Sequence, residues 1–146
     1  MKTISLTDEQ YKDLMQLVYL GNFMANATRN NDEMIEAFEN IEQHIYTFAE
    51  QFGCGEYVDR HDAVEGIYPT REFEEMMDRF IAEYDSDIFW EELLHRMTER
   101  DLVDAYGEPA VASMGIVERI EKERGFVQTY DREFGENGLK NLRIVK

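Results

Sequence analysis

The sequence predicts an all-α fold, a compact bundle of about five helices that forms a single domain over residues 1–146. Apolar side chains recur at spacings of three and four residues along most of the chain, which is the period of an amphipathic helix. Residues that cap helices stand before several of these segments. Hydrophobic residues make up 43% of the 146 residues, so the chain can bury a core despite a net charge of -17.

The first helix is expected from about Asp8 to Thr28, after a capping box formed by Thr7 and Gln10. Its second half is apolar on nearly all sides, which is typical of a central helix. A second helix is expected from about Asn31 to Gln51, with Asn30 as its cap. Its predicted core stripe consists of apolar residues at helical spacing: Ile35, Phe38, Ile41, Ile45, Phe48 and Phe52.

The segment from Gly53 to Pro69 has no sustained periodicity, and we expect a loop of about fifteen residues there. Two helices should follow, over Arg71–Tyr84 and about Asp87–Tyr106, separated by an Asp-Ser-Asp sequence. A last long helix should have Pro109 in its first turn and run to about residue 134. Gly125 is the position where a bend or break in that helix is expected.

Both ends of the chain alternate between apolar and polar residues, which is the period of a strand. Ile4 and Leu6 show this pattern near the start, and Leu142 and Ile144 show it within Leu139–Val145. We therefore expect a minor two-stranded pairing of the N- and C-terminal segments, supported by the helices beneath it.

The most unusual feature is a segment of residues 30–59 that has no Lys or Arg. It contains eight carboxylates: Asp32, Glu33, Glu36, Glu39, Glu42, Glu50, Glu56 and Asp59. Charge of this kind repels phosphate backbones and anionic lipids but attracts basic partners, so we expect no direct nucleic-acid binding. The longest apolar stretch, Leu17–Ala27, is about half the roughly 20 residues of a membrane span. A single cysteine and an acidic start without a signal-peptide pattern predict a cytoplasmic protein.

Four of these acids, Asp32, Glu36, Glu39 and Glu50, form the predicted binding face. Like charges three and four residues apart destabilise a helix, and no basic residue relieves the repulsion here. The sequence therefore favours a non-enzymatic interaction or regulatory protein that binds a basic partner, with homodimer formation through one of the very apolar helices. Salt adaptation and mimicry of nucleic-acid charge are two other interpretations of the acidity.

A polar stripe interrupts the first predicted helix at spacings of three and four residues. Buried amides need hydrogen-bond partners, so this stripe either faces water or lines a polar pocket or an oligomer interface. Its members are Gln16, Tyr19, Asn22, Asn26 and Arg29.

An alternative function comes from two acidic patterns, Glu36-x-x-Glu39 and Glu75-x-x-Asp78, on different predicted helices. They resemble the paired acidic helices of all-helical nucleotide pyrophosphatases. In those enzymes, the resemblance implies, carboxylates collect magnesium ions that hold the triphosphate and activate water. The alternative is therefore a magnesium-dependent nucleotide pyrophosphohydrolase that uses these four residues.

Three shorter motifs have weaker support. Glu92 and His95 have the spacing of half a di-iron site, but a solvent-exposed histidine explains them as well. His61-Asp62 is similar to the ligand pair of metal-dependent phosphohydrolases, although it lies in a predicted loop. Cys54 has an acidic neighbourhood that disfavours a reactive thiolate, so a small residue in a tight turn is the simpler interpretation.

Overall fold

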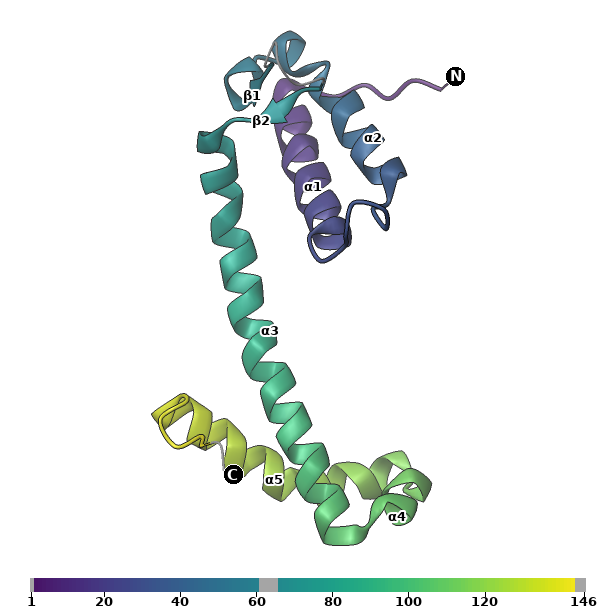
Figure 1. Ribbon diagram of the computed structural model, residues 1–146, viewed down its shortest axis with the longest axis vertical. Helices are drawn as coiled ribbons and strands as arrows, with labels where there is room; N and C mark the ends of the chain where they lie inside the picture. The colour runs from purple at the N-terminus through teal and green to yellow at the C-terminus, as the bar shows by residue number, and fades with distance from the viewer. Residues whose placement is uncertain (1, 61–65, 144–146) are drawn as a thin grey trace. The chain divides into compact units, whose positions relative to one another are not determined.

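The computed structural model describes residues 2–60 and 66–143 (Figure 1). The chain is 74% helical, which confirms the prediction of an all-α fold with about five helices. The helices of the described residues are α1 (Asp8–Asn26), α2 (Glu36–Tyr46), α3 (Arg71–Tyr106), α4 (Glu108–Ser113) and α5 (Ile116–Asn137). The chain divides into two compact units, Met1–Ala82 and Glu83–Lys146, which we call the first and second unit. The single domain stays a prediction.

Helix α1 begins as predicted. The Gln10 backbone N–H donates to Thr7 Oγ1 at 3.2 Å, and the Thr7 N–H donates to Gln10 Oε1 at 3.0 Å. These two bonds satisfy N–H groups that the first helical turn would otherwise leave without partners. The helix ends at Asn26, slightly before the predicted Thr28.

Helix α2 lies alongside α1 (Figure 1) but begins at Glu36, later than the predicted Asn31. The reason is the Asn26 side chain, whose Oδ1 accepts the backbone N–H of Ile35 at 2.8 Å. That bond orders the turn before α2 by satisfying the backbone N–H of Ile35, the residue that precedes the helix. The helix also ends early, and a separate 3-10 helix, η1 (Ala49–Phe52), follows it.

The predicted core stripe of this segment is partly wrong. Phe38 is 45% exposed and Ile41 is 48% exposed, whereas Glu42 is only 8% exposed and Tyr46 is fully buried. Residues 35, 42, 46 and 49 have the same helical spacing as the predicted stripe, so periodicity alone allows either face to be buried. The face that packs against α1 is therefore rotated from the predicted one and has a carboxylate at its centre.

The first unit has a continuous apolar core. The Tyr11 ring stacks on Phe52 with centroids 4.3 Å apart, and its hydroxyl donates to the Ile45 carbonyl at 2.6 Å. Stacked aromatic pairs add to the stability that burial provides. The fully packed members are Tyr11, Met15, Tyr46, Ala49, Cys54, Tyr57, Ile67, Phe73 and Met77.

The described part of the predicted loop is ordered against this core. It contains a short 3-10 helix, η2 (Gly55–Tyr57), and two antiparallel strands, β1 (Val58–Asp59) and β2 (Tyr68–Pro69). The predicted pairing of the chain ends is wrong for the described residues, because residues 2–7 and 138–143 contain no strand. Two short segments far apart in sequence lose much chain entropy on pairing, whereas β1 and β2 are close neighbours along the chain. Ile144 lies outside the described residues.

Helix α3 is continuous over 36 residues, so the predicted break at Asp85-Ser86-Asp87 is wrong. Asp and Ser are weak helix formers, but each costs well under about 1 kcal/mol and neither blocks the backbone as proline does. The predicted last helix is instead divided in two at Met114, where the backbone is extended. Gly115 precedes α5, whereas Gly125 lies inside it without a break.

The second unit has a small core. Its buried side chains in the described part are Thr98, Leu102, Val111 and Phe134. Gly107, with a φ of +82°, makes the turn between α3 and α4, and Pro109 lies in the first turn of α4 as predicted. None of the helices in residues 2–60 and 66–143 combines the length and the apolar composition of a membrane span.

Candidate functional site

The predicted acidic residues are exposed in the structure. Glu36 and Glu39 lie on α2, Asp32 lies in the turn before it, and Glu50 lies in η1. They therefore do not share one helix face, because α2 is shorter than predicted. None of the four carboxylates has an ion-pair partner among the described residues.

The excess of acid is greatest in the first unit. Residues 1–82 contain 17 Asp and Glu and 6 Lys and Arg, so this unit carries -11 of the total of -17. On α2 itself there is no Lys or Arg at all. Water and mobile ions screen such surface charge, but they do not neutralise it at close range.

The polar stripe of α1 is partly buried against α2. Asn26 Nδ2 donates to Asn22 Oδ1 at 2.7 Å, and Asn22 Nδ2 donates to Glu42 Oε2 at 2.7 Å. The Tyr46 hydroxyl donates to the other oxygen of Glu42 at 2.9 Å. These four side chains form a polar network inside the first unit, so this part of the stripe faces protein rather than water. A buried amide that has such partners needs no ligand to explain it.

The remaining stripe residues have separate surroundings. Gln16 is half-buried, and the half-buried Tyr19 contacts the Phe73 ring edge-on with centroids 5.5 Å apart. Arg29 is exposed, and its Nε donates to the carbonyl of Ala25 at 2.8 Å near the end of α1. The structure therefore brings Asn22 and Asn26 together and leaves Arg29 apart from them.

Burial controls the electrostatics of this network. Loss of water around Glu42 raises the pKa of its carboxyl, the hydrogen bonds from Tyr46 and Asn22 lower it, and Glu39 raises it further. Burial also raises the pKa of Tyr46, and the adjacent Glu42 adds to that shift. The pKa of Tyr19 is raised by burial first and then by Glu74, Asp78 and Glu42. These shifts therefore come first from burial, and the neighbouring carboxylates add to them.

The four residues of the magnesium alternative are all exposed. Glu75 accepts a hydrogen bond from Arg71 Nε at 2.7 Å, and Asp78 lies one turn further along α3. Within residues 2–60 and 66–143, no three His, Cys, Asp or Glu side chains lie close enough together to hold a metal ion. The structure therefore does not bring Glu36, Glu39, Glu75 and Asp78 together as a metal centre.

The weaker motifs have simple structural explanations where the structure describes them. Cys54 is buried, its Sγ lies 3.6 Å from the Phe52 carbonyl, and burial raises the pKa of its thiol. His95 is exposed on α3, where Glu92 pairs with Arg96 at 3.0 Å. His61-Asp62 lies outside the described residues.

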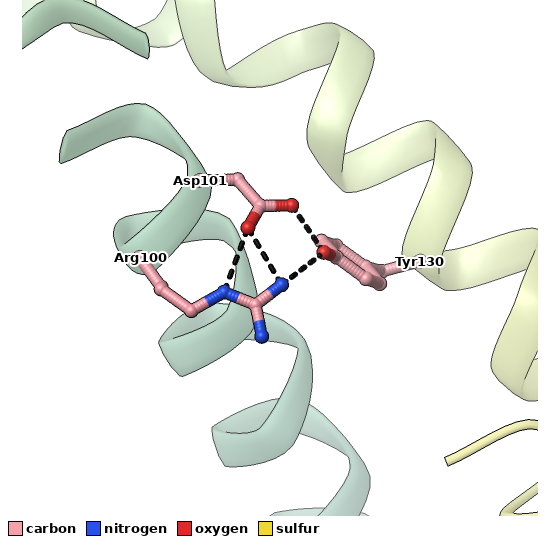
Figure 2. Close-up of polar contacts among 3 residues, drawn as sticks. All are labelled: Arg100, Asp101 and Tyr130. Carbon is pink, nitrogen blue, oxygen red and sulfur yellow. Dashed lines mark hydrogen bonds and ion pairs between the residues drawn. The ribbon is translucent and has the colours of Figure 1, made fainter. Parts of the chain in front are cut away.

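A polar cluster in the second unit was not predicted from the sequence. Arg100 Nε donates to Asp101 Oδ1 at 2.7 Å, and Arg100 Nη2 donates to the Tyr130 hydroxyl at 3.0 Å (Figure 2). The Tyr130 hydroxyl in turn donates to Asp101 Oδ2, which lowers the pKa of the Asp101 carboxyl. The cluster joins α3 to α5 across a separation of 29 residues, which no local pattern reveals.

An open pocket of about 320 Å³ lies beside these helices in the second unit. Trp90, Glu91 and Leu94 of α3 line one side, and Asp131, Phe134 and Gly135 of α5 line the other. The Trp90 and Phe134 rings are 5.6 Å apart between centroids. The pocket is therefore mainly apolar, and each of the two helices contributes one acidic residue to its lining, Glu91 or Asp131.

No protein family model matches this chain, and comparisons with curated proteins and with solved structures give no significant match. The function is therefore argued from the chain's own residues and their geometry.

Proposed function

We propose that this protein is a cytoplasmic, non-enzymatic interaction or regulatory module whose exposed acidic residues bind a basic protein partner. The observation that supports this is a set of exposed carboxylates in a segment without Lys or Arg: Asp32, Glu36, Glu39 and Glu50. They have no ion-pair partner in the part of the chain that the structure describes. The cytoplasmic setting is supported by the single cysteine, which cannot form an intramolecular disulfide.

The physical reason is the unrelieved repulsion on α2. Glu36 and Glu39 are one turn apart, and a Lys at a neighbouring position would stabilise the helix by a few tenths of a kcal/mol. A partner with Lys or Arg side chains supplies that compensation on binding. Opposite charge also accelerates encounter between the two proteins, and this acceleration falls as salt screens the charges.

The proposal includes a homodimer as a second part. Two copies that met through the acidic side of α2 would repel each other, so self-association requires a different surface. Binding of a basic partner and formation of a homodimer are therefore compatible, because they use separate parts of the chain.

A pull-down at low and high ionic strength tests the basic partner. We expect Glu36→Gln/Glu39→Gln to lose most partner capture, because it removes both charges from the exposed side of α2. The matched control, Asp85→Asn/Asp87→Asn, changes the net charge equally on exposed residues of α3 and should retain capture. Partner binding that ignores ionic strength, or that falls equally in both variants, would contradict the proposal.

Calorimetry with magnesium separates this module from the magnesium-dependent hydrolase. The module predicts weak, diffuse binding that salt abolishes, because isolated surface carboxylates hold hydrated magnesium poorly. Micromolar binding with a fixed stoichiometry, lost on Glu75→Gln/Asp78→Asn substitution, would favour the hydrolase instead.

A further inference from the structure

Helix α5 exposes apolar side chains that the second unit itself does not cover. Ile116 is 80% exposed and Ile120 is 55% exposed, while the described part of this unit buries only four residues. A unit of this size with so small a core is rarely stable without further burial or another support. Exposed apolar surface of this kind is typical of a protein-protein contact.

Apolar residues of α5 form one stripe that is exposed at its N-terminal end. Ile116, Ile120, Val127 and Phe134 follow one another at spacings of four, seven and seven residues, which places them on the same side of α5. Ile116 and Ile120 are exposed, Val127 is half-buried and Phe134 is buried. Phe134 lines the pocket at one end of this stripe, and Ile120 protrudes near the other end. A second hollow of about 360 Å³ follows the helix between them, from Ile120 to Gln128.

The exposed Ile120 and the pocket at Phe134 are spaced so that each can meet the other in a second copy of the chain. If two α5 helices lie antiparallel across a twofold axis at Val127, a residue seven positions before the axis faces one seven positions after it. Ile120 then faces Phe134 of the partner subunit and points at its pocket. That pocket, at about 320 Å³, is large enough for an isoleucine side chain.

The charges along the stripe fit the same arrangement. Arg124 and Asp131 are both exposed, and neither has an ion-pair partner among the described residues. Arg124 lies three residues before Val127, and Asp131 lies four residues after it. Across the twofold axis, Arg124 of one copy therefore lies opposite the residue next to the partner subunit's Asp131. Two chains of charge -17 repel each other least where local charges cancel, and this edge of α5 carries both signs.

We propose that α5 forms an antiparallel homodimer in which Ile120 of each copy occupies the pocket at Trp90, Leu94 and Phe134 of the partner subunit. This inference deepens the homodimer part of the proposed function. It differs from the sequence-based expectation in using α5 of the second unit rather than a very apolar helix such as α1. It does not depend on the basic partner, so the two proposals fail independently.

Sedimentation and light scattering on the full chain test the dimer. We expect wild type at twice the chain mass of 17.3 kDa, and Ile120→Asp with a dimer Kd raised at least about tenfold. Leu17→Asp, on a residue of α1 that is 67% exposed, is the matched control and should leave the dimer intact. Circular dichroism of each variant shows whether the helices remain folded.

A charge exchange tests the antiparallel register. Arg124→Asp and Asp131→Arg should each weaken the homodimer, because each places like charges at both symmetric contacts. An equimolar mixture of the two variants should recover the dimer, since both contacts then join opposite charges. Both residues are exposed, so neither substitution disturbs the core.

Three outcomes would overturn the proposal. The first is a wild-type protein that stays at 17.3 kDa at about 100 µM, far above a micromolar Kd. The second is dissociation by Leu17→Asp but not by Ile120→Asp, which would place the contact on α1. The third is a mixture of the two charge variants that associates no better than either variant alone. Loss of partner capture with an intact dimer would instead concern only the acidic residues of the first unit.

Discussion

The two units of this chain stabilise their helices in different ways. The first unit packs nine buried residues into one core and places a hydrogen-bonded carboxylate, Glu42, inside it. The second unit buries four described residues and joins α3 to α5 through half-exposed polar groups such as Asp101 and Tyr130. The comparison teaches that apolar burial stabilises the first unit, whereas the second unit has a smaller core of its own, to which the proposed homodimer would add apolar burial.

The largest expected effect tests the core of the first unit. Phe73→Ala should lower the free energy of unfolding by about 3–5 kcal/mol, because Phe73 is fully buried and its removal leaves a cavity. Chemical denaturation followed by circular dichroism measures the change. Phe89→Ala on the second-unit part of α3 is the control, and it should cost less than about 1 kcal/mol since Phe89 is exposed. Equal losses in the two variants would erase the distinction between the units.

A second prediction uses the pH response of the first unit. Burial raises the pKa of Glu42 above its ordinary value of 4.5, so the folded state holds its proton more tightly than the unfolded state. The resulting contribution to stability is complete below pH 4.5 and is lost as the pH rises through the folded-state pKa. Glu42→Gln should remove this dependence, because the amide does not titrate.

Denaturation of wild type and Glu42→Gln at a series of pH values measures the difference. The wild-type protein should lose stability relative to the variant as the pH rises from 4.5 toward neutrality. A difference that stays constant over this range would show that Glu42 titrates as an ordinary surface carboxyl.

The smallest expected effect concerns the second unit. Tyr130→Phe removes the hydroxyl that bonds Asp101 and Arg100, and it should cost about 0.5–1 kcal/mol because solvent screens these groups. The stability that Asp101 contributes depends on pH with the opposite sign to that of Glu42. The Asp101 pKa is lowered from 3.8, so the contribution is present above pH 3.8 and is lost as the pH falls through the folded-state pKa.

Denaturation of wild type and Tyr130→Phe at neutral and acid pH checks this. The difference in the free energy of unfolding between the two proteins should become smaller in acid. A gap that widens below pH 3.8 would contradict the assignment of the Tyr130 hydroxyl as a donor to the Asp101 carboxylate.

Local signals predicted much of this fold. The capping box at Thr7 placed the start of α1 correctly, and Pro109 marked the first turn of α4. These features involve neighbours within one helical turn, whose geometry the sequence states directly. The break expected at Asp85 and the bend expected at Gly125 were wrong, because weak helix formers are tolerated inside a helix when its neighbours favour the same structure.

The candidate sites were harder to predict because they depend on contacts between distant segments. Two equally periodic faces of the second helix competed for the core, and packing against α1 selected the one that contains Glu42. A signal for this choice was present in Asn22, whose half-buried amide donates to the Glu42 carboxylate. The contact of Asp101 with Tyr130 and the pocket at Trp90 had no comparable signal, since α3 and α5 each supply only half of them.

The burial of Cys54 makes the rate at which its thiol is alkylated a measure of local opening of the structure. Its thiol is shielded in the first unit and holds its proton more tightly than a free cysteine, so an alkylating reagent must wait for an opening of the surrounding structure. Because this is the sole cysteine of the chain, the labelling rate reports openings that expose this one site in the first unit. The labelling kinetics of this one sulfur atom therefore measure local openings around Cys54 that a global unfolding curve does not distinguish.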